Sequence, residues 1–174
     1  MGPPGHFGIA LAARPLVSAV PLWALLVASE ALDLLSFGFI SLGLERMAVS
    51  EINLQDGIQT LVPGSVPWSH GLFASLVWSV LFAAVSYLIL KNWKAGVIIG
   101  LVTFSHWILD FMVHSPDLPV FGSNSPQLGL GLWTSGPGFI ISILLELILL
   151  GSGLAIYWLA RKRETPSEPE LPLI

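Results

Sequence analysis

The sequence predicts an all-α integral membrane protein: a bundle of four transmembrane helices preceded by a short N-terminal half-helix. Hydrophobic residues make up 54% of the 174 residues and charged residues only 10%, whereas about a quarter of the residues of a soluble domain are charged. Four segments are also long and apolar enough to cross the roughly 30 Å hydrocarbon core of a bilayer. The lipid bilayer is therefore the first expected partner.

The order of the elements follows from the apolar stretches and from the turns that separate them. Residues 5–13 are apolar but too few to span, so we expect a half-helix that is re-entrant or interfacial. A tight turn at 91–94 joins the second and third spans into an antiparallel hairpin. Residues 1–163 then form the membrane domain, and residues 164–174, rich in Glu and Pro, a disordered tail. The four expected spans are approximately 21–44, 69–90, 95–115 and 138–160.

Positive charge predicts the orientation. Arg14, Lys91, Lys94 and the run 161–163 flank the spans at what would be one end of the bundle, and such residues mark the cytoplasmic side. The C-terminus is therefore expected in the cytoplasm, and the loops 45–68 and 116–137 on the other side of a bacterial inner membrane. No basic patch supports nucleic-acid binding.

One apolar segment carries an unusual set of ionisable residues. His106, Asp110 and His114 are spaced i, i+4, i+8, so on a helix they share one face. Each ionisable group in such a span costs about 2.5 to 3.5 kcal/mol and asks for a compensating partner, such as a metal, a proton path or a polar substrate. A polar seam between helices is the alternative.

Depth along the helices brings further polar residues toward the same level. At about 1.5 Å per residue, Asp33, Asp110 and Glu146 enter the outer half of the bilayer, and His70 lies at the mouth of its helix. His6 joins them only if the half-helix starts on the outer side. Because the chain has no cysteine, a metal site must use His, Asp and Glu, which suits a divalent ion such as zinc or manganese. The predicted metal ligands are His6, Asp33, His70, His106, Asp110 and His114.

The number of ions and the general base are less constrained. His106 and His114 would stand about 12 Å apart along a helix, so one ion is not expected to bind both. Glu30, Asp117 and Glu146 are the candidate general bases. The glutamates could instead join helices through hydrogen bonds, and Asp117 could shape a turn. Ser69 precedes His70, but neighbours on a helix point about 100° apart, so no pairing is expected.

These residues resemble those of a known family. His6, Asp33 in Leu-Asp-Leu-Leu, His70 in Pro-Trp-Ser-His-Gly-Leu, and Ser-His-Trp-Ile-Leu-Asp110 follow the order seen in the membrane-bound metal-dependent hydrolases of bacteria, which look like transmembrane relatives of zinc-dependent phospholipase C. Residues 5–133 also resemble a group of small uncharacterised bacterial membrane proteins. The chain departs from the hydrolase pattern at Ser29-Glu30-Ala-Leu-Asp33, where that family has Pro-Asp-x-Asp.

The resemblance implies metal-assisted hydrolysis of a phosphoester or of another small-molecule or lipid-like substrate near the outer leaflet. Two other functions fit the residues. A proton-coupled permease would also place His, Asp and Glu near the midplane, although four spans without internal repeats or broken half-helix pairs fit transporters poorly. A four-helix bundle could also hold a haem between His70 and His106.

Overall fold

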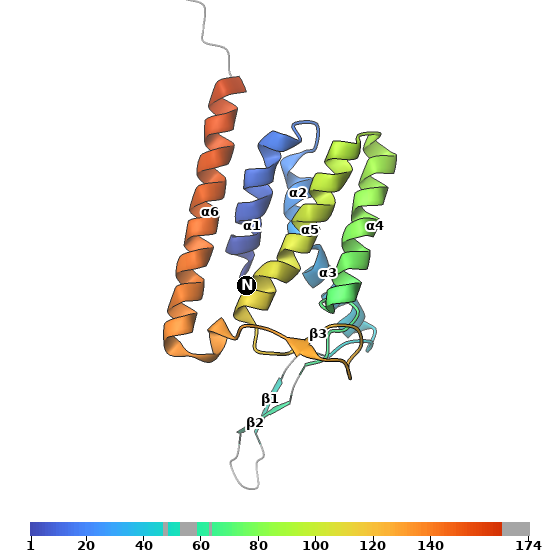
Figure 1. Ribbon diagram of the computed structural model, residues 1–174, viewed down its shortest axis with the longest axis vertical. Coiled ribbons are helices and arrows are strands. Elements are labelled where there is room, and N and C mark those ends of the chain that lie inside the picture. The colour runs from blue at the N-terminus through green and yellow to red at the C-terminus, as the bar shows by residue number, and fades with distance from the viewer. Residues whose placement is uncertain (47–48, 53–58, 63, 165–174) are drawn as a thin grey trace, which may run out of the picture.

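The computed structural model describes residues 1–46, 49–52, 59–62 and 64–164 and is mostly helical (Figure 1). Of the expected tail 164–174, Glu164 belongs to the last helix, and residues 165–174 lie outside the described residues. The elements are α1 Pro3–Ala13, η1 Arg14–Leu16, α2 Leu22–Ser29, α3 Ala31–Ser41, β1 Val49–Ile52, β2 Gln59–Val62, α4 Leu72–Leu90, α5 Trp93–Val113, β3 Leu118–Pro119, β4 Gln127–Leu128, η2 Leu132–Thr134 and α6 Gly136–Glu164.

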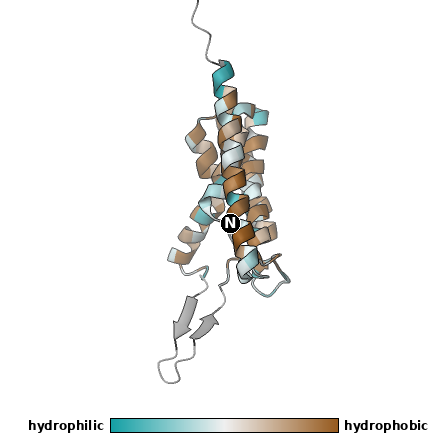
Figure 2. Cartoon of the chain, turned by 90° about the vertical axis from the view of Figure 1, so that its left-hand side faces the viewer, coloured by the Kyte–Doolittle hydropathy of each residue, from teal (hydrophilic) through white to brown (hydrophobic). Residues whose placement is uncertain are grey.

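Three helices of the described chain, α4, α5 and α6, are long and apolar enough to cross a membrane. α5 is the central helix: 56% of its most apolar stretch is buried, against 11% for α4 and for α6. Many exposed side chains of α4 and α6 are large and apolar, and Figure 2 shows the predominantly hydrophobic residues along α6, as expected of helices that contact lipid. The membrane class of the protein is therefore supported by the fold.

The predicted span 21–44 is not one helix. α2 and α3 meet at Glu30 with a bend of 55°, so the predicted count of four spans depends on taking this pair as one. The break has a local cause at Ser29. Its hydroxyl donates back to the Leu26 carbonyl at 2.8 Å, and its own carbonyl accepts a hydrogen bond from a histidine ring on α5. In an unbroken helix that carbonyl would accept from the amide of Asp33.

The connection between α4 and α5 confirms the predicted hairpin. Lys91 adopts the left-handed conformation, with φ 50°, and ends α4. Asn92 then begins α5 by accepting a hydrogen bond from the Ala95 amide at 3.2 Å, as N-cap residues do. The two helices pack side by side along their length (Figure 1).

The predicted half-helix is α1, which packs inside the bundle against α6 and α5. Eleven residues give a length of about 16 Å, too short to span alone. The contact with α6 is close because glycines face each other: a Cβ at Gly153 would stand 2.1 Å from the Gly8 carbonyl oxygen, and one at Gly8 would stand 2.4 Å from the Leu149 carbonyl oxygen. Small residues permit such approach between membrane helices.

Replacing Gly153 with alanine is therefore expected to destabilise the protein by about 1 to 3 kcal/mol, the usual cost of inserting a group into a packed interface. Gly151 provides the matched control on the same helix, since a Cβ there meets nothing within 4 Å. Thermal unfolding in one detergent measures both variants. Equal melting temperatures for the two would contradict this account of the α1 and α6 contact.

The two ends of the bundle differ. The ends of α1 and α6 and the turn between α4 and α5 lie together at the upper end (Figure 1), and this end carries Arg14, Lys91, Lys94 and Arg161 to Arg163. The opposite end holds the long connections. Within them the all-α prediction is incomplete, because β1 pairs with β2 and β3 with β4 as short antiparallel ladders.

Candidate metal centre

Three helices and one turn bring five ionisable side chains together inside the bundle. α1 supplies His6, α3 supplies Asp33, the turn before α4 supplies His70, and α5 supplies His106 and Asp110. All but Asp33 are buried, and Asp33 is partly exposed. Two overlapping groups of three meet the geometric conditions for holding a metal ion: His6, His106 and Asp110, and Asp33, His70 and His106. The structure therefore supports a metal-binding cluster made of His and Asp.

The distances within the cluster fall in a narrow range. The Nε2 atoms of His70 and His106 lie 3.3 Å apart. They stand 3.5 and 3.3 Å from Oδ2 of Asp110, and 3.2 and 3.5 Å from Oδ1 of Asp33. Ligands bound at 2.0 to 2.1 Å in a tetrahedral shell are about 3.4 Å from one another. Each triangle formed by these two nitrogens and one carboxylate oxygen therefore has the size of one face of such a shell.

His6 reaches this cluster because α1 begins beside it. Its Nε2 atom lies 3.5 Å from Oδ1 of Asp110, and its ring stacks on that of His106 with 3.9 Å between centroids. The Nδ1 atom of His6 is buried and has no hydrogen-bond partner within the described chain. The amino group of Met1 contacts Oδ1 of Asp110 as well, so positive charge already faces this carboxylate.

Hydrogen bonds fix which nitrogen of each central histidine faces the cluster. Nδ1 of His106 donates to the Ser29 carbonyl at 2.7 Å, since a carbonyl can only accept. Nδ1 of His70 is 2.8 Å from the Ser69 hydroxyl. In the neutral rings Nε2 is therefore the acceptor. Two lone pairs and two carboxylates then face one another, an arrangement that a cation between them would stabilise.

Glu45 and Ser69 form a support for His70 that the sequence does not reveal. Glu45 is 2% exposed and accepts hydrogen bonds at Oε1 from the amides of Trp68 and Ser69, both at 2.8 Å. Its Oε2 accepts from the Ser69 hydroxyl at 2.7 Å, so that hydroxyl must accept from His70. The expectation that Ser69 and His70 do not pair is wrong, because they lie in a turn and α4 begins only at Leu72.

His114 approaches the cluster from its edge. α5 ends at Val113, and His114 is its C-cap residue with an extended backbone. The His114 amide still bonds the Asp110 carbonyl, so His114 follows Asp110 by one helical turn as predicted, and its Nε2 lies 3.9 Å from Oδ2 of Asp110. Nδ1 of His114 lies 3.2 Å from Oδ1 of Asp117. His114 is therefore placed to bind at the cavity side of the cluster.

Asp117 orients His114. Burial raises the pKa of its carboxyl, but the hydrogen bond and charge of His114 and the hydrogen bonds from Ser115 and the backbone together outweigh burial, so the pKa lies below its ordinary value. Ser115 also donates to Oδ2 of Asp117 at 3.0 Å. A carboxylate held in this way is a weak base, so the structure favours an orienting role over the predicted role as general base.

The other two predicted bases occupy different places. Glu30 lies at the bend between α2 and α3, and its Oε1 atom is buried without a hydrogen-bond partner in the described part of the chain. Glu146 on α6 accepts from the Gly2 amide at 2.7 Å. It thus anchors the start of α1, which fits the alternative prediction that this glutamate joins helices through hydrogen bonds. It does not line the cavity beside the cluster.

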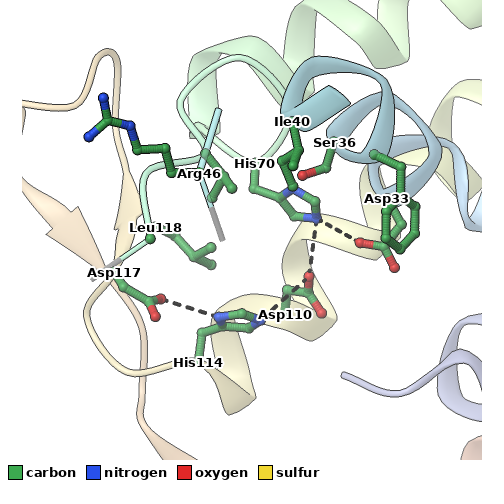
Figure 3. A pocket seen from close by; sticks show the side chains of 12 residues that line it. Asp33, Ser36, Ile40, Arg46, His70, Asp110, His114, Asp117 and Leu118 are labelled. Atoms are coloured by element: carbon green, nitrogen blue, oxygen red, sulfur yellow. Dashed lines mark hydrogen bonds and ion pairs between the residues drawn. The ribbon is translucent and has the colours of Figure 1, made fainter. Parts of the chain in front are cut away.

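A cavity of about 270 Å³ opens beside the cluster. Asp33, His70, Asp110 and His114 form its inner wall (Figure 3). Apolar side chains of α3 and of the later loops cover much of the rest, and Arg46 lies in its lining. The other lining residues are Ser36, Phe37, Ile40, Gly64, Val66, Asp117 and Leu118.

No protein-family model, curated protein or solved structure that was compared with this chain matches it. The resemblance to metal-dependent hydrolases therefore stays a prediction, and the function is argued from the geometry of the site.

Proposed function

We propose that this chain is an integral membrane metal-dependent hydrolase that acts on a phosphoester or lipid-like substrate. The observation that carries the proposal is the convergence of two imidazole nitrogens, 3.3 Å apart, with two carboxylates that each lie 3.2 to 3.5 Å from both nitrogens, beside an open cavity. Nitrogen and oxygen donors at tetrahedral spacing suit zinc, with manganese as the second choice.

A bound divalent ion would supply a water of lowered pKa and polarise the oxygen under attack. The residues of the chain do the remaining work. Hydrogen bonds from the rings of His70 and His106 to Ser69 and Ser29 hold their Nε2 atoms toward the ion. Glu30 does not line the cavity, but it lies at the bend beside Asp33 and its buried Oε1 has no partner in the described chain, so it is the proposed acceptor for the proton of the attacking water.

The cavity lining supports the proposed substrate class. Arg46 is the cation in the lining, and a guanidinium can bind a phosphate through two hydrogen bonds. Phe37 and Ile40 of α3 provide an apolar wall next to it. A negatively charged head with an apolar tail matches both parts. The site also lies at the end of the membrane helices that bears the long connections (Figure 1), within reach of a lipid headgroup.

The site geometry argues against a haem between His70 and His106. Bis-histidine ligation places the two rings on opposite faces of a flat macrocycle. Here the ring centroids of His70 and His106 are 5.3 Å apart, with an angle of 59° between the ring planes. Asp33 and Asp110 contact the Nε2 atoms of both rings. His6 also covers one face of the His106 ring. A proton- or cation-coupled permease remains the second candidate, because the broken pair of α2 and α3 beside ionisable residues is a feature of transporters.

Purified protein in nanodiscs tests the proposal. We expect stoichiometric zinc or manganese by elemental analysis, a rise in melting temperature of the chelated protein when either ion is returned, and hydrolysis of a phospholipid or a synthetic phosphoester that chelation abolishes. Metal binding without hydrolysis, together with ion or proton flux in liposomes, would favour the permease. A protein that neither holds nor responds to metal would rule out the hydrolase.

We further propose that the protein lies in a bacterial inner membrane with the basic end and the C-terminus in the cytoplasm. The gathering of Arg14, Lys91, Lys94 and Arg161 at one end supports this orientation. Reporter fusions after Arg163 and within residues 50–60 are expected to give signals from opposite sides of the membrane. Signals from the same side would contradict the topology.

A further inference from the structure

A second cavity lies at the other end of the bundle, where the junction of α1 and η1 meets the last turns of α6 (Figure 1). Its volume is about 250 Å³, and its lining consists of Arg14, Pro15, Tyr157, Ala160 and Arg161. None of these residues contributes to the metal cluster, so the cavity is separate from the proposed function.

The local structure presents two guanidinium groups to this cavity. Pro15 follows the end of α1, where the chain turns through η1, and this places Arg14 beside α6. Tyr157 and Arg161 are one turn apart on α6, and Nη1 of Arg161 lies 3.5 Å from the Tyr157 hydroxyl. Both therefore face the same side of α6 as the bend of the chain that carries Arg14.

The donors around the cavity favour a phosphate group. Arginine offers a planar set of N–H donors that matches phosphate oxygens in pairs, and the tyrosine hydroxyl adds another donor. None of the described residues that line the cavity is acidic. An anion of phosphate size is therefore the ligand that complements this wall in both charge and hydrogen bonding.

The position of the cavity identifies the source of the phosphate as a lipid. Ile156 and Leu159 on α6 next to it are about half exposed, which gives acyl chains an apolar surface to follow. The Lys162 ammonium lies 3.6 Å from the Trp158 ring centre, a pairing suited to the boundary between headgroups and hydrocarbon. Basic pockets between membrane helices at this boundary bind anionic headgroups.

We propose that the cavity between Arg14 and Arg161 binds the phosphate of an anionic phospholipid, whose acyl chains lie along α6. The lipid joins the end of α1 to the end of α6. Because α1 carries His6 and contacts Asp110 through its first residues, the lipid stabilises the helix that closes one side of the cluster.

The experiment compares protein in nanodiscs of phosphatidylcholine with protein in nanodiscs containing phosphatidylglycerol. Phosphatidylglycerol is expected to raise the melting temperature of the wild type, and native mass spectrometry is expected to retain about one such lipid per chain. In Arg14→Gln/Arg161→Gln, retention should fall about tenfold or more and the rise in melting temperature should vanish. Lys91→Gln/Lys94→Gln removes the same charge from the same end and is expected to behave as the wild type.

Three outcomes overturn the proposal. One is an equal loss of lipid in both double variants, which indicates general attraction to a basic end. Another is an equal rise in melting temperature when glycerol phosphate is added to phosphatidylcholine nanodiscs, which identifies a soluble phosphate as the ligand. The last is full retention of lipid without Arg14 and Arg161. If the double variant does not fold, the single variant Arg14→Gln decides by the same measurements.

Discussion

Replacing Asp110 with asparagine is expected to abolish metal binding while leaving the protein inserted and folded. Its two carboxylate oxygens face four histidines: Oδ1 is near His6, and Oδ2 is within 3.9 Å of His70, His106 and His114. Asparagine keeps the size of the side chain and removes the charge. A buried carboxylate is costly without a cation, so the membrane tolerates the neutral amide, which is a far poorer ligand.

His106→Ala should have the same effect, since His106 belongs to both groups of possible ligands. We expect the metal affinity of either variant to fall by more than about 100-fold, beyond the 10- to 100-fold loss usual for outer-shell changes. Glu146→Gln removes a carboxylate outside the cluster and should retain the metal. If the cluster is only a polar seam between helices, the variants of Asp110 and His106 will lower the melting temperature and the wild type will contain no metal.

Removing the Ser69 hydroxyl is expected to weaken metal binding by about 10- to 100-fold with every ligand still present. The hydroxyl accepts a hydrogen bond from Nδ1 of His70 and donates one to Glu45. Ser69→Ala therefore leaves the His70 ring free to rotate or to change tautomer. Glu45→Gln should act in the same direction, because an amide that still accepts from the backbone cannot replace both carboxylate oxygens.

Ser79→Ala is the matched control for Ser69→Ala. Ser79 is also buried, and its hydroxyl donates a hydrogen bond to the Ser75 carbonyl one turn back on α4. Metal titration and thermal unfolding of the metal-free proteins separate the two roles. A loss of metal affinity confined to Ser69→Ala supports orientation of His70. A similar loss of stability in both, with unchanged metal affinity, would contradict it.

Periodicity and depth were enough to predict much of the fold and of the site. The apolar segments anticipated α4, α5 and α6, and the spacing of His106 and Asp110 gave two residues that α5 does place on one face. Asp33 and His70 could be added because helix rise alone sets their level in the membrane. His6 depended on where α1 begins, which hydropathy does not determine for a helix too short to span.

Features that depend on tertiary contacts could not be predicted. Glu45 lies 24 residues before Ser69, and only folding of the connection between α3 and α4 brings the two together. No proline or glycine lies near Glu30 to predict the break between α2 and α3. The break arises where the His106 ring of α5 donates a hydrogen bond to the Ser29 carbonyl, an interaction between residues 77 positions apart. The contact of His114 with Asp117 likewise depends on how the chain folds after α5 ends.

The break between α2 and α3 sets a conflict between stability and activity. One interrupted turn both frees the carbonyl that orients His106 and turns Asp33 into the cluster. A sequence that restored a regular helix through Glu30 would satisfy its backbone more fully, and it would withdraw both contributions at once without altering a ligand. Selection for a more robust span therefore opposes selection for the site, and variants chosen only for thermal tolerance should lose metal affinity first at this turn.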